Sequence, residues 1–563
     1  MAKRSKFIPL DQPMFHPDHR RPRTRREFIA QGFTAGAGIA LSSPLALISQ
    51  QVAAITTIEQ LGETPPGCRM GAAGNSKIPF ICFDLAGGAN FAGSNVLIGK
   101  QGGQLDFLDT AGYNKQGLPG DQIPGANNLD PAITDNADFE FGLAFHTDSQ
   151  LLAGMKEKAG IGGVVNAADF TSGAVIPARS QNDTGNNPHN PMYGIASAGD
   201  VRDSSNPSLP SGLGGANGQV VTLIGSQNSD SGGNSMAPAG MIDLAFRPTK
   251  VDRASDATGL VDLGGLINLP AGSPAERTAI LEAAFRLSDD KMAQMNTLIS
   301  GNNGIGNMSD AELRNAIRCA YAQSADLADR FGAGSASLSP YYTGDNDFIN
   351  GQIFTTAELD NDREFQKTAS IMKLVIDGIA GAGTVTMGGY DYHTGDRSTG
   401  EARDLRAGRC IGACLAYAAL KGSPLMIYVV SDGSVFSNGM IDSSVGGRGK
   451  GVWTGDNQQT AAAFFLVYDP RRRPVINTAG SVVDPALHQQ LGWMSGSGDV
   501  VTTSSPAANN VEALVNMVVL NYMALHSEVG LFSTKFSNHG LGPELDRWVA
   551  FEPLYSQTMA SPI

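Results

Sequence analysis

An aspartate and a histidine two residues apart are the most informative candidates for chemistry in this sequence. Asp391 and His393 lie in the run Gly388-Gly389-Tyr390-Asp391-Tyr392-His393, which follows a short apolar stretch. A carboxylate and an imidazole in one turn can converge on one cation, and this pair of ligands suits zinc, iron or manganese. The alternative is a turn aspartate that caps the loop backbone beside a hydrogen-bonded histidine.

Three more aspartates lie where an apolar stretch gives way to a loop. Asp432 follows residues 425–430, Asp84 follows residues 78–83, and Asp456 lies in a later glycine-rich loop. Ligands of open α/β sheets bind just beyond the carboxyl ends of the strands. For Asp84, a hydrogen bond to a buried backbone group is the alternative. We therefore predict a divalent metal, zinc, manganese or calcium, held by Asp391, His393, Asp432, Asp84 and Asp456.

Two cations lie among the glycines of the loop predicted over residues 446–457. Arg448 and Lys450, with the backbone amides around them, can approach a negatively charged group. The sequence thus predicts an anion-binding role for both, with solvated loop charges as the alternative.

A separate polar loop holds residues that an ester hydrolase could use. Ser180, beside Arg179, is the candidate nucleophile, and His189 could reach such a site from the same loop. The sequence contains no Gly-x-x-x-x-Gly-Lys-Ser/Thr loop, no Gly-x-Ser-x-Gly elbow and no His-Glu-x-x-His pair. These absences leave the common signatures of nucleotide hydrolases, serine esterases and zinc proteases without support.

Apolar stretches alternate with amphipathic ones along the chain, which predicts a mostly parallel sheet covered by helices on both faces. Residues 171–240 are rich in Gly, Ser, Asn and Asp and predict long loops. The fold class is three-layer α/β/α, in a single domain over residues 55–563 with a helical insertion at about 270–335. Strands are predicted at residues 78–83, 161–165, 220–224, 384–387, 425–430 and 462–468, and helices at 273–298, 309–331, 357–380, 401–420 and 511–525.

The N-terminal segment predicts export. Thr24-Arg25-Arg26-Glu27-Phe28-Ile29 matches the twin-arginine pattern, and a weakly apolar run leads to small residues ending at Ala54. Residues 1–54 are therefore predicted to be a signal peptide that engages the twin-arginine translocase. The expected location is the periplasm or the outside of a bacterium. The alternative is a basic amphipathic helix on a cytosolic protein.

Charge and composition exclude other classes of protein. The formal net charge is −14 over 563 residues, and the first 54 residues hold eight Lys and Arg against three Asp and Glu, so the remainder is strongly acidic. An acidic body repels phosphate backbones, so we expect no nucleic-acid partner. Hydrophobic residues make up 41% of the chain, enough for a large core, but no stretch after the signal predicts a stable membrane span. None of the five cysteines forms a Cys-x-x-Cys pair.

These motifs resemble a large bacterial family of twin-arginine-exported proteins, a domain of unknown function in the alkaline phosphatase and sulfatase superfamily. The run 388–393 resembles the family's Gly-Gly-Trp-Asp-x-His turn, and residues 429–432 resemble the start of its Ser-Glu-Phe-Gly-Arg segment. The resemblance extends over roughly residues 78–470 and implies an alkaline-phosphatase-like fold.

The sequence departs from that family at positions that would hold metal. Asn90 replaces an aspartate of the first motif, Asn457 replaces the histidine of an Asp-His-Gly segment, and Gly433 with Ser434 replaces the Phe-Gly-Arg portion. Such changes weaken a two-metal site. The function expected is a non-catalytic binding or assembly role with a degenerate metal site. The alternative is a metal-dependent phosphate or sulfate ester hydrolase.

Overall fold

The computed structural model describes residues 77–125, 136–160, 166–180, 188–198, 222–225, 237–243, 246, 248–260, 335–344, 349–393 and 395–555. The predicted signal peptide, the strand predicted at 161–165 and the helices predicted at 273–298 and 309–331 lie outside these residues.

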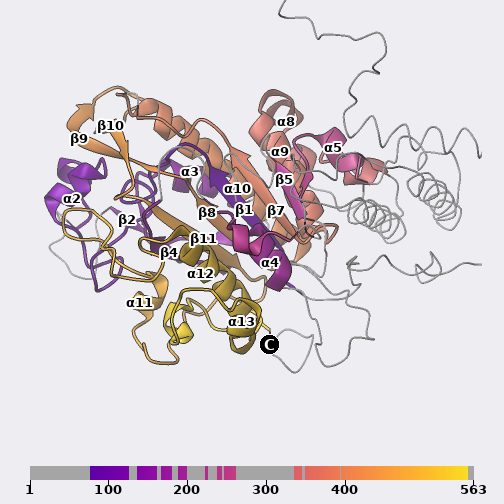
Figure 1. Ribbon diagram of the computed structural model, residues 1–563. Coiled ribbons are helices and arrows are strands. Elements are labelled where there is room, and N and C mark those ends of the chain that lie inside the picture. The colour runs from indigo at the N-terminus through magenta and orange to yellow at the C-terminus, as the bar shows by residue number, and fades with distance from the viewer. Residues whose placement is uncertain are drawn as a thin grey trace, which may run out of the picture.

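A seven-stranded sheet forms the centre of the molecule (Figure 1). β11 is antiparallel to both of its neighbours, and every other pair of adjacent strands is parallel. The prediction of a mixed α/β fold with a mostly parallel sheet is therefore confirmed. In spatial order the strands are β4 (Thr171–Pro177), β11 (Ala462–Tyr468), β8 (Leu425–Val430), β1 (Phe80–Leu85), β7 (Ala382–Met387), β5 (Thr222–Gly225) and β6 (Thr249–Lys250).

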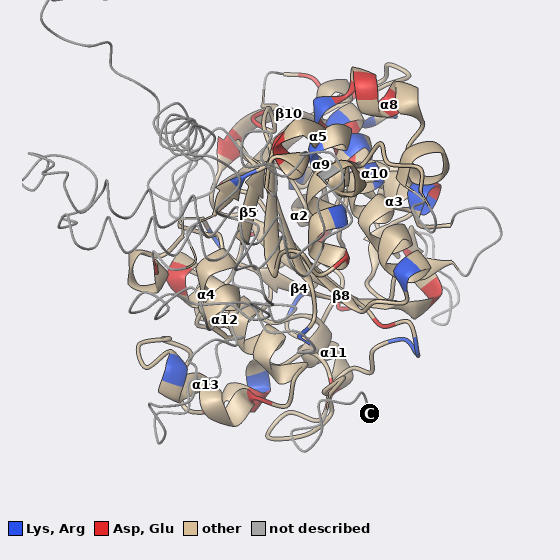
Figure 2. Ribbon diagram, turned by 90° about the vertical axis from the view of Figure 1, so that its right-hand side faces the viewer, with Lys and Arg blue, Asp and Glu red and all other residues tan. Residues whose placement is uncertain are grey.

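Helices cover both faces of this sheet. α3 (Gln150–Ala159), α9 (Arg363–Ile376) and α10 (Ser398–Lys421) lie on one side, and α4 (Met192–Ala198) and α12 (Val511–Ala524) lie on the other, as Figures 1 and 2 both show. Alternate residues of β1 pack into the cores on opposite faces of the sheet. Ile81 and Phe83 pack on the side of α3, α9 and α10, and Phe80 and Cys82 pack on the side of α4 and α12. Each large apolar side chain buried in this way contributes about 2 kcal/mol.

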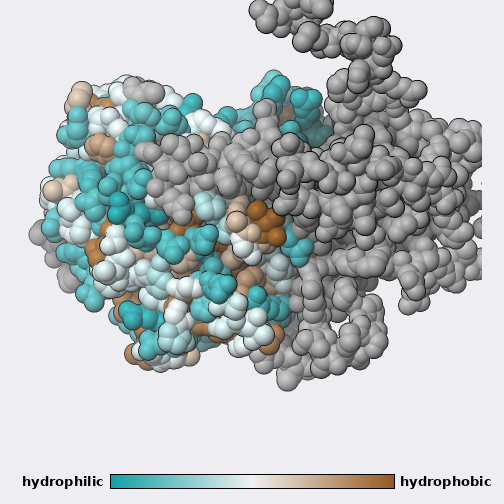
Figure 3. Space-filling view, viewed as in Figure 1, coloured by the Kyte–Doolittle hydropathy of each residue, from teal (hydrophilic) through white to brown (hydrophobic). Residues whose placement is uncertain are grey.

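Shorter elements surround these layers. Figure 2 shows charged segments on α3, α8, α9 and α10 around largely uncharged strands, and Figure 3 shows a face where hydrophilic and hydrophobic side chains are interspersed. None of the helices in the described ranges has the length and apolar character of a bilayer-spanning helix. The shorter elements are α2 (Thr110–Lys115), α5 (Ala254–Thr258), α8 (Thr356–Asn361), α11 (Pro485–Gln489), α13 (Val529–Lys535), β2 (Ala137–Asp138), β3 (Phe145–His146), β9 (Ser434–Asp442) and β10 (Lys450–Asn457).

Three expectations about local structure are wrong. The predicted loop region 171–240 contains the buried strand β4 and the helix α4. The predicted loop 446–457 contains β10, which pairs antiparallel with β9. The helix predicted at 357–380 is two helices, because Asp362 leaves helical geometry and its carboxylate accepts a hydrogen bond from the N–H of Glu364, which caps the start of α9.

Glycines allow α10 to lie directly against α3. A Cβ added at Gly408 would lie 2.0 Å from the carbonyl oxygen of Leu151, and one added at Gly412 would lie 2.5 Å from that of Met155. These obstructing atoms are backbone, so a side chain cannot be accommodated by a rotamer change. The two helices must separate if either glycine gains a side chain.

We therefore predict that Gly408→Ala destabilises the protein. The expected loss is about 1–3 kcal/mol from overpacking, partly offset by the better helix propensity of alanine. Gly530→Ala in α13 is the matched control, since a Cβ there meets nothing within 4 Å. Urea unfolding of both variants measures the effect, and equal stability of Gly408→Ala and Gly530→Ala would contradict the close packing.

Candidate functional site

Two buried aspartates and a histidine lie together at the carboxyl edge of the sheet. Asp84 is in β1, Asp432 follows β8, and His189 precedes α4. His189 Nε2 lies 3.0 Å from Asp84 Oδ1, and the side chains of both residues are almost fully buried. Burial raises the pKa of Asp432, the negative charge of Asp84 raises it further, and His189 opposes the shift. The three side chains therefore share one electrostatic environment.

The alternation of β1 explains why Asp84 meets His189. Asp84 is on the same face as Phe80 and Cys82, which is the face covered by α4 and α12. Asn190 holds the incoming loop at this position: its Nδ2 donates to Thr384 Oγ1 of β7, and its Oδ1 accepts from the N–H of Met192. The segment before α4 thus brings an imidazole over the end of β1.

The turn after β1 joins Asp432 to the run that holds Asp391. The N–H of Gly87 donates to Asp432 Oδ1 at 2.6 Å, and a Cβ at Gly87 would lie 2.3 Å from the backbone nitrogen of Asp391. Ser431 Oγ donates to the carbonyl of Leu85 and accepts from the N–H of Ala89. Backbone of the first turn is therefore held between the turns that follow β7 and β8.

Asp391 and His393 pair with each other. His393 Nε2 lies 2.8 Å from Asp391 Oδ1, and the two side chains are 35% and 59% exposed, respectively. Asp456 is exposed on β10, where its backbone is paired with Val435 of β9. Within the described ranges, no three His, Cys, Asp or Glu side chains are placed to hold one metal ion. The geometry does not fit a centre shared by the five predicted ligands, and zinc, manganese or calcium binding stays a prediction.

The two cations predicted to bind an anion have carboxylate partners within the protein. Lys450 is fully buried; its Nζ lies 2.8 Å from Glu401 Oε2 and donates to the carbonyl of Asp148. Arg448 donates to the carboxylate of Asp148. Burial lowers the pKa of Lys450, and the charge of Arg397 contributes to that shift. The anion-binding role stays a prediction, but this geometry gives both cations a structural function.

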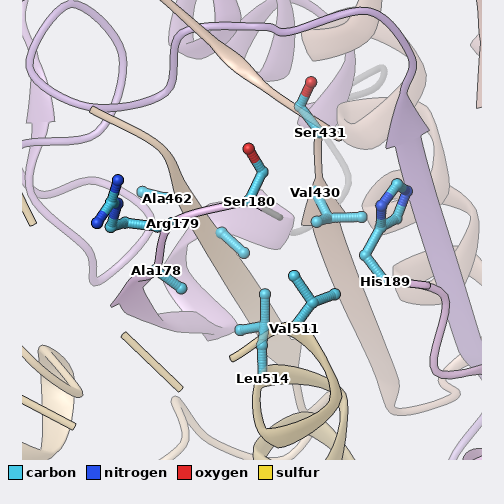
Figure 4. Close-up of a pocket in the computed structure, with 10 residues that line it drawn as sticks. Ala178, Arg179, Ser180, His189, Val430, Ser431, Ala462, Val511 and Leu514 are labelled. Atoms are coloured by element: carbon cyan, nitrogen blue, oxygen red, sulfur yellow. The ribbon is translucent and has the colours of Figure 1, made fainter. Parts of the chain in front are cut away.

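A small pocket beside the buried pair combines polar and apolar side chains (Figure 4). It is partly open to solvent, and its space together with the adjoining solvent amounts to about 260 Å³. Ser180 Oγ and Arg179 Nε are buried and form no hydrogen bond within the described part of the chain. The sequence offered both Ser180 and His189 as candidates on one loop, and both line this pocket. The lining residues are Ala178, Arg179, Ser180, His189, Val430, Ser431, Ala462, Ala463, Val511 and Leu514.

A buried tyrosine joins the predicted metal-binding turn to α10. Tyr392 Oη accepts from the N–H of Asn90 and donates to Asp404 Oδ1, while Asn95 Nδ2 donates to Asp404 Oδ2. The pKa of Asp404 is raised to about 7: burial is the main cause, the hydrogen bond from Asn95 opposes it, and the negative charge of Glu401 adds to it. Asp404 is thus an acid whose protonation changes near neutral pH.

Comparison with known proteins adds no relative to this description, because no family model, no curated protein and no solved structure matches the chain.

We expect Gly87→Ala to destabilise the protein more than Gly88→Ala. Both glycines have positive φ, +128° and +122°, so alanine is strained at either position. Only at Gly87 does a Cβ overlap backbone; at Gly88 the nearest atom is 3.4 Å away. The difference between their free energies of unfolding isolates the contact with Asp391. Equal losses in the two variants would show that the turns do not meet at Gly87.

Asp404→Asn is predicted to change how stability depends on pH. The folded-state pKa of Asp404 lies above its unfolded value, so the native state binds more protons between about pH 4 and pH 7. This group therefore makes the wild-type protein less stable as the pH rises through that range, by at most about 1.4 kcal/mol per pH unit.

The measurement is the difference in unfolding free energy between Asp404→Asn and wild type from pH 4 to pH 8. It should shift steadily in favour of the variant as the pH rises to 7 and then level off. Asp442→Asn is the control: hydrogen bonds from Ser444 lower the pKa of Asp442, so its effect should be constant over this range. A pH-independent difference for Asp404→Asn would contradict the assignment.

Proposed function

We propose that this chain is a bacterial protein exported by the twin-arginine translocase, with the layered fold of the alkaline phosphatase and sulfatase superfamily. Its role is to bind a ligand or partner in the periplasm or outside the cell, without metal-dependent hydrolysis of phosphate or sulfate esters. The seven-stranded, mostly parallel sheet between helical layers is compatible with that fold. The proposal on export rests on the twin-arginine run near the N-terminus.

The proposed loss of metal chemistry rests on the hydrogen bonds of Asn90 and Asn457, the two asparagines that stand where the resembled family has metal ligands. Asn90 is buried; its Nδ2 donates to the carbonyl of Val435, and its Oδ1 accepts from Ser94 Oγ. Asn457 Oδ1 accepts from both the N–H and the Oγ1 of Thr460. The Asn90 amide therefore joins the first turn to β9 by donating a hydrogen bond, which an ionised aspartate could not do, while Asn457 holds the local turn at Thr460.

Four of the five predicted ligands also have partners within the protein. Asp432 accepts from Gly87, Asp84 pairs with His189, and Asp391 pairs with His393. Metal binding would have to replace these contacts. The Asp391–His393 pair is the most exposed of these. In the alternative function, metal-dependent ester hydrolysis, the metal ion would therefore bind at this pair.

Elemental analysis of folded protein, exported by its native route, tests the proposal. We expect zinc, manganese and calcium far below one ion per chain, and no hydrolysis of p-nitrophenyl phosphate or p-nitrophenyl sulfate before or after metal loading. Partner capture should be the same for wild type and for the double variant Asp391→Ala, His393→Ala.

Asp121→Ala, which alters an exposed carboxylate elsewhere, is the matched control for the capture experiment. One metal ion per chain that is lost in the double variant, together with ester hydrolysis that is lost with it, would overturn the proposal in favour of the hydrolase. Partner capture that fails in the double variant but not in Asp121→Ala would count against a role independent of this turn.

A further inference from the structure

The ribbon of β9 and β10 contains an irregular segment in which an asparagine precedes a glycine. The ribbon lies at the outer edge of the described chain (Figure 1). Its register pairs Ser437 with Trp453 and Ile441 with Gly451. Residues 438–440, Asn-Gly-Met in sequence, therefore lie opposite a single residue of β10, and all three are exposed. A bulge of this kind places its extra residues outside the regular ladder of strand hydrogen bonds.

The side chain of Asn438 is held over the peptide that follows it. Its Oδ1 accepts a hydrogen bond from the N–H of Met440 at 3.1 Å, which forms an Asx turn around Gly439. This hydrogen bond draws electron density onto Oδ1, so Asn438 Cγ becomes more open to attack. The same N–H is placed to stabilise the negative charge that develops on Oδ1 when a nucleophile adds to Cγ.

The backbone nitrogen of Gly439 is the nucleophile within reach of that carbon. Its N–H donates to Ser437 Oγ at 3.2 Å, so a hydroxyl that can take up its proton is already in place. Gly439 has a φ of +92°, which a glycine adopts readily. Because Gly439 has no side chain, nothing on it obstructs closure of a ring between its nitrogen and Asn438 Cγ. Nucleophile, proton acceptor and oxyanion donor are thus gathered within four consecutive residues.

A second Asn-Gly pair in the structure has the opposite arrangement. The N–H of Gly351 donates to the carbonyl of Phe354 at 2.7 Å, and Asn350 Oδ1 accepts from Thr356 Oγ1. Both hydrogen bonds must break before the side chain of Asn350 can react with the Gly351 nitrogen. The fold therefore restrains this pair and favours reaction at Asn438. The other two Asn-Gly pairs of the sequence begin at Asn217 and Asn303 and lie outside the described residues.

We propose that Asn438 is a site of self-modification, at which the chain cyclises and loses ammonia without an enzyme. The Gly439 nitrogen bonds to Asn438 Cγ, and its proton passes through the Ser437 hydroxyl to the side-chain amide nitrogen. That nitrogen leaves as ammonia when its bond to Cγ breaks. Water then opens the cyclic imide at either carbonyl, which gives aspartate or isoaspartate at position 438. This inference goes beyond the proposed binding role and does not depend on it.

The product changes the exposed surface of the ribbon. It carries one additional negative charge beside Met440 and Ile441, which are 61% and 53% exposed. In the isoaspartate form the backbone also runs through the side chain and is longer by one methylene. Modified and unmodified chains therefore present different surfaces at this place, one charged and one largely apolar.

The test incubates the full chain at neutral pH, either folded or unfolded in urea, and follows the two sites by peptide mass mapping that separates aspartate from isoaspartate. In the folded chain, Asn438 should convert at least as fast as in the unfolded chain and about tenfold or more faster than Asn350, which corresponds to about 1.4 kcal/mol in activation free energy. In the unfolded chain the two sites should convert at similar rates, because glycine follows the asparagine at both.

Ser437→Ala tests the proton relay. It should slow the conversion of Asn438 in the folded chain and leave the rate in the unfolded chain unchanged, which a loss that came from sequence alone would not do. Ser443→Ala, which alters an exposed serine between β9 and β10, is the matched control and should change neither rate.

The proposal is overturned if the folded wild-type chain converts Asn438 more slowly than the unfolded chain does. It is also overturned if Asn350 converts as fast as Asn438 in the folded chain, or if folded Ser437→Ala converts Asn438 at the wild-type rate. The comparison of the two sites within the wild-type chain decides the case even if Ser437→Ala fails to fold.

Discussion

The burial of two carboxylates at one edge of the sheet is the constraint that organises this site. Asp84 and Asp432 are both fully buried, and an ionised group taken out of water costs several kcal/mol unless a partner compensates. The imidazole of His189 and the N–H of Gly87 supply those partners. Positive φ at Gly87 and the docking of the segment before α4 both follow from this need.

The same constraint bears on the proposed loss of metal chemistry. A divalent ion would satisfy buried carboxylates by charge, and in this structure the Gly87 N–H and the His189 imidazole reach them as hydrogen-bond partners. Asn90 extends this pattern, because its amide joins the first turn to β9, and Asn457 accepts hydrogen bonds within its own turn. The pocket that holds Ser180 lies beside these carboxylates, and the Ser180 hydroxyl is one of several buried polar groups that form no hydrogen bond within the described part of the chain.

The sequence could predict the features that depend on residues close together in the chain, and it missed those that depend on residues far apart. Residues 425–430 were predicted to the residue as β8, because a strand buried on both faces is continuously apolar. β4 was missed because it starts with small polar residues, although it is fully buried beside β11. Asp84 was found by its place after an apolar stretch, but its partner His189 is 105 residues away. Lys450 was predicted to bind an anion from a loop, and only the pairing of β10 with β9 places it in a strand, where it is buried.

Anomalous X-ray diffraction from crystals grown with zinc is the most direct test of the central proposal that hydrogen bonds, and not a metal, satisfy the buried carboxylates. The account predicts no anomalous peak within bonding distance of Asp84 or Asp432. It also predicts that His189 Nε2 remains within hydrogen-bond distance of Asp84 Oδ1. A strong peak bonded to Asp432 together with Asp84 or His393, with His189 displaced from Asp84, would contradict it.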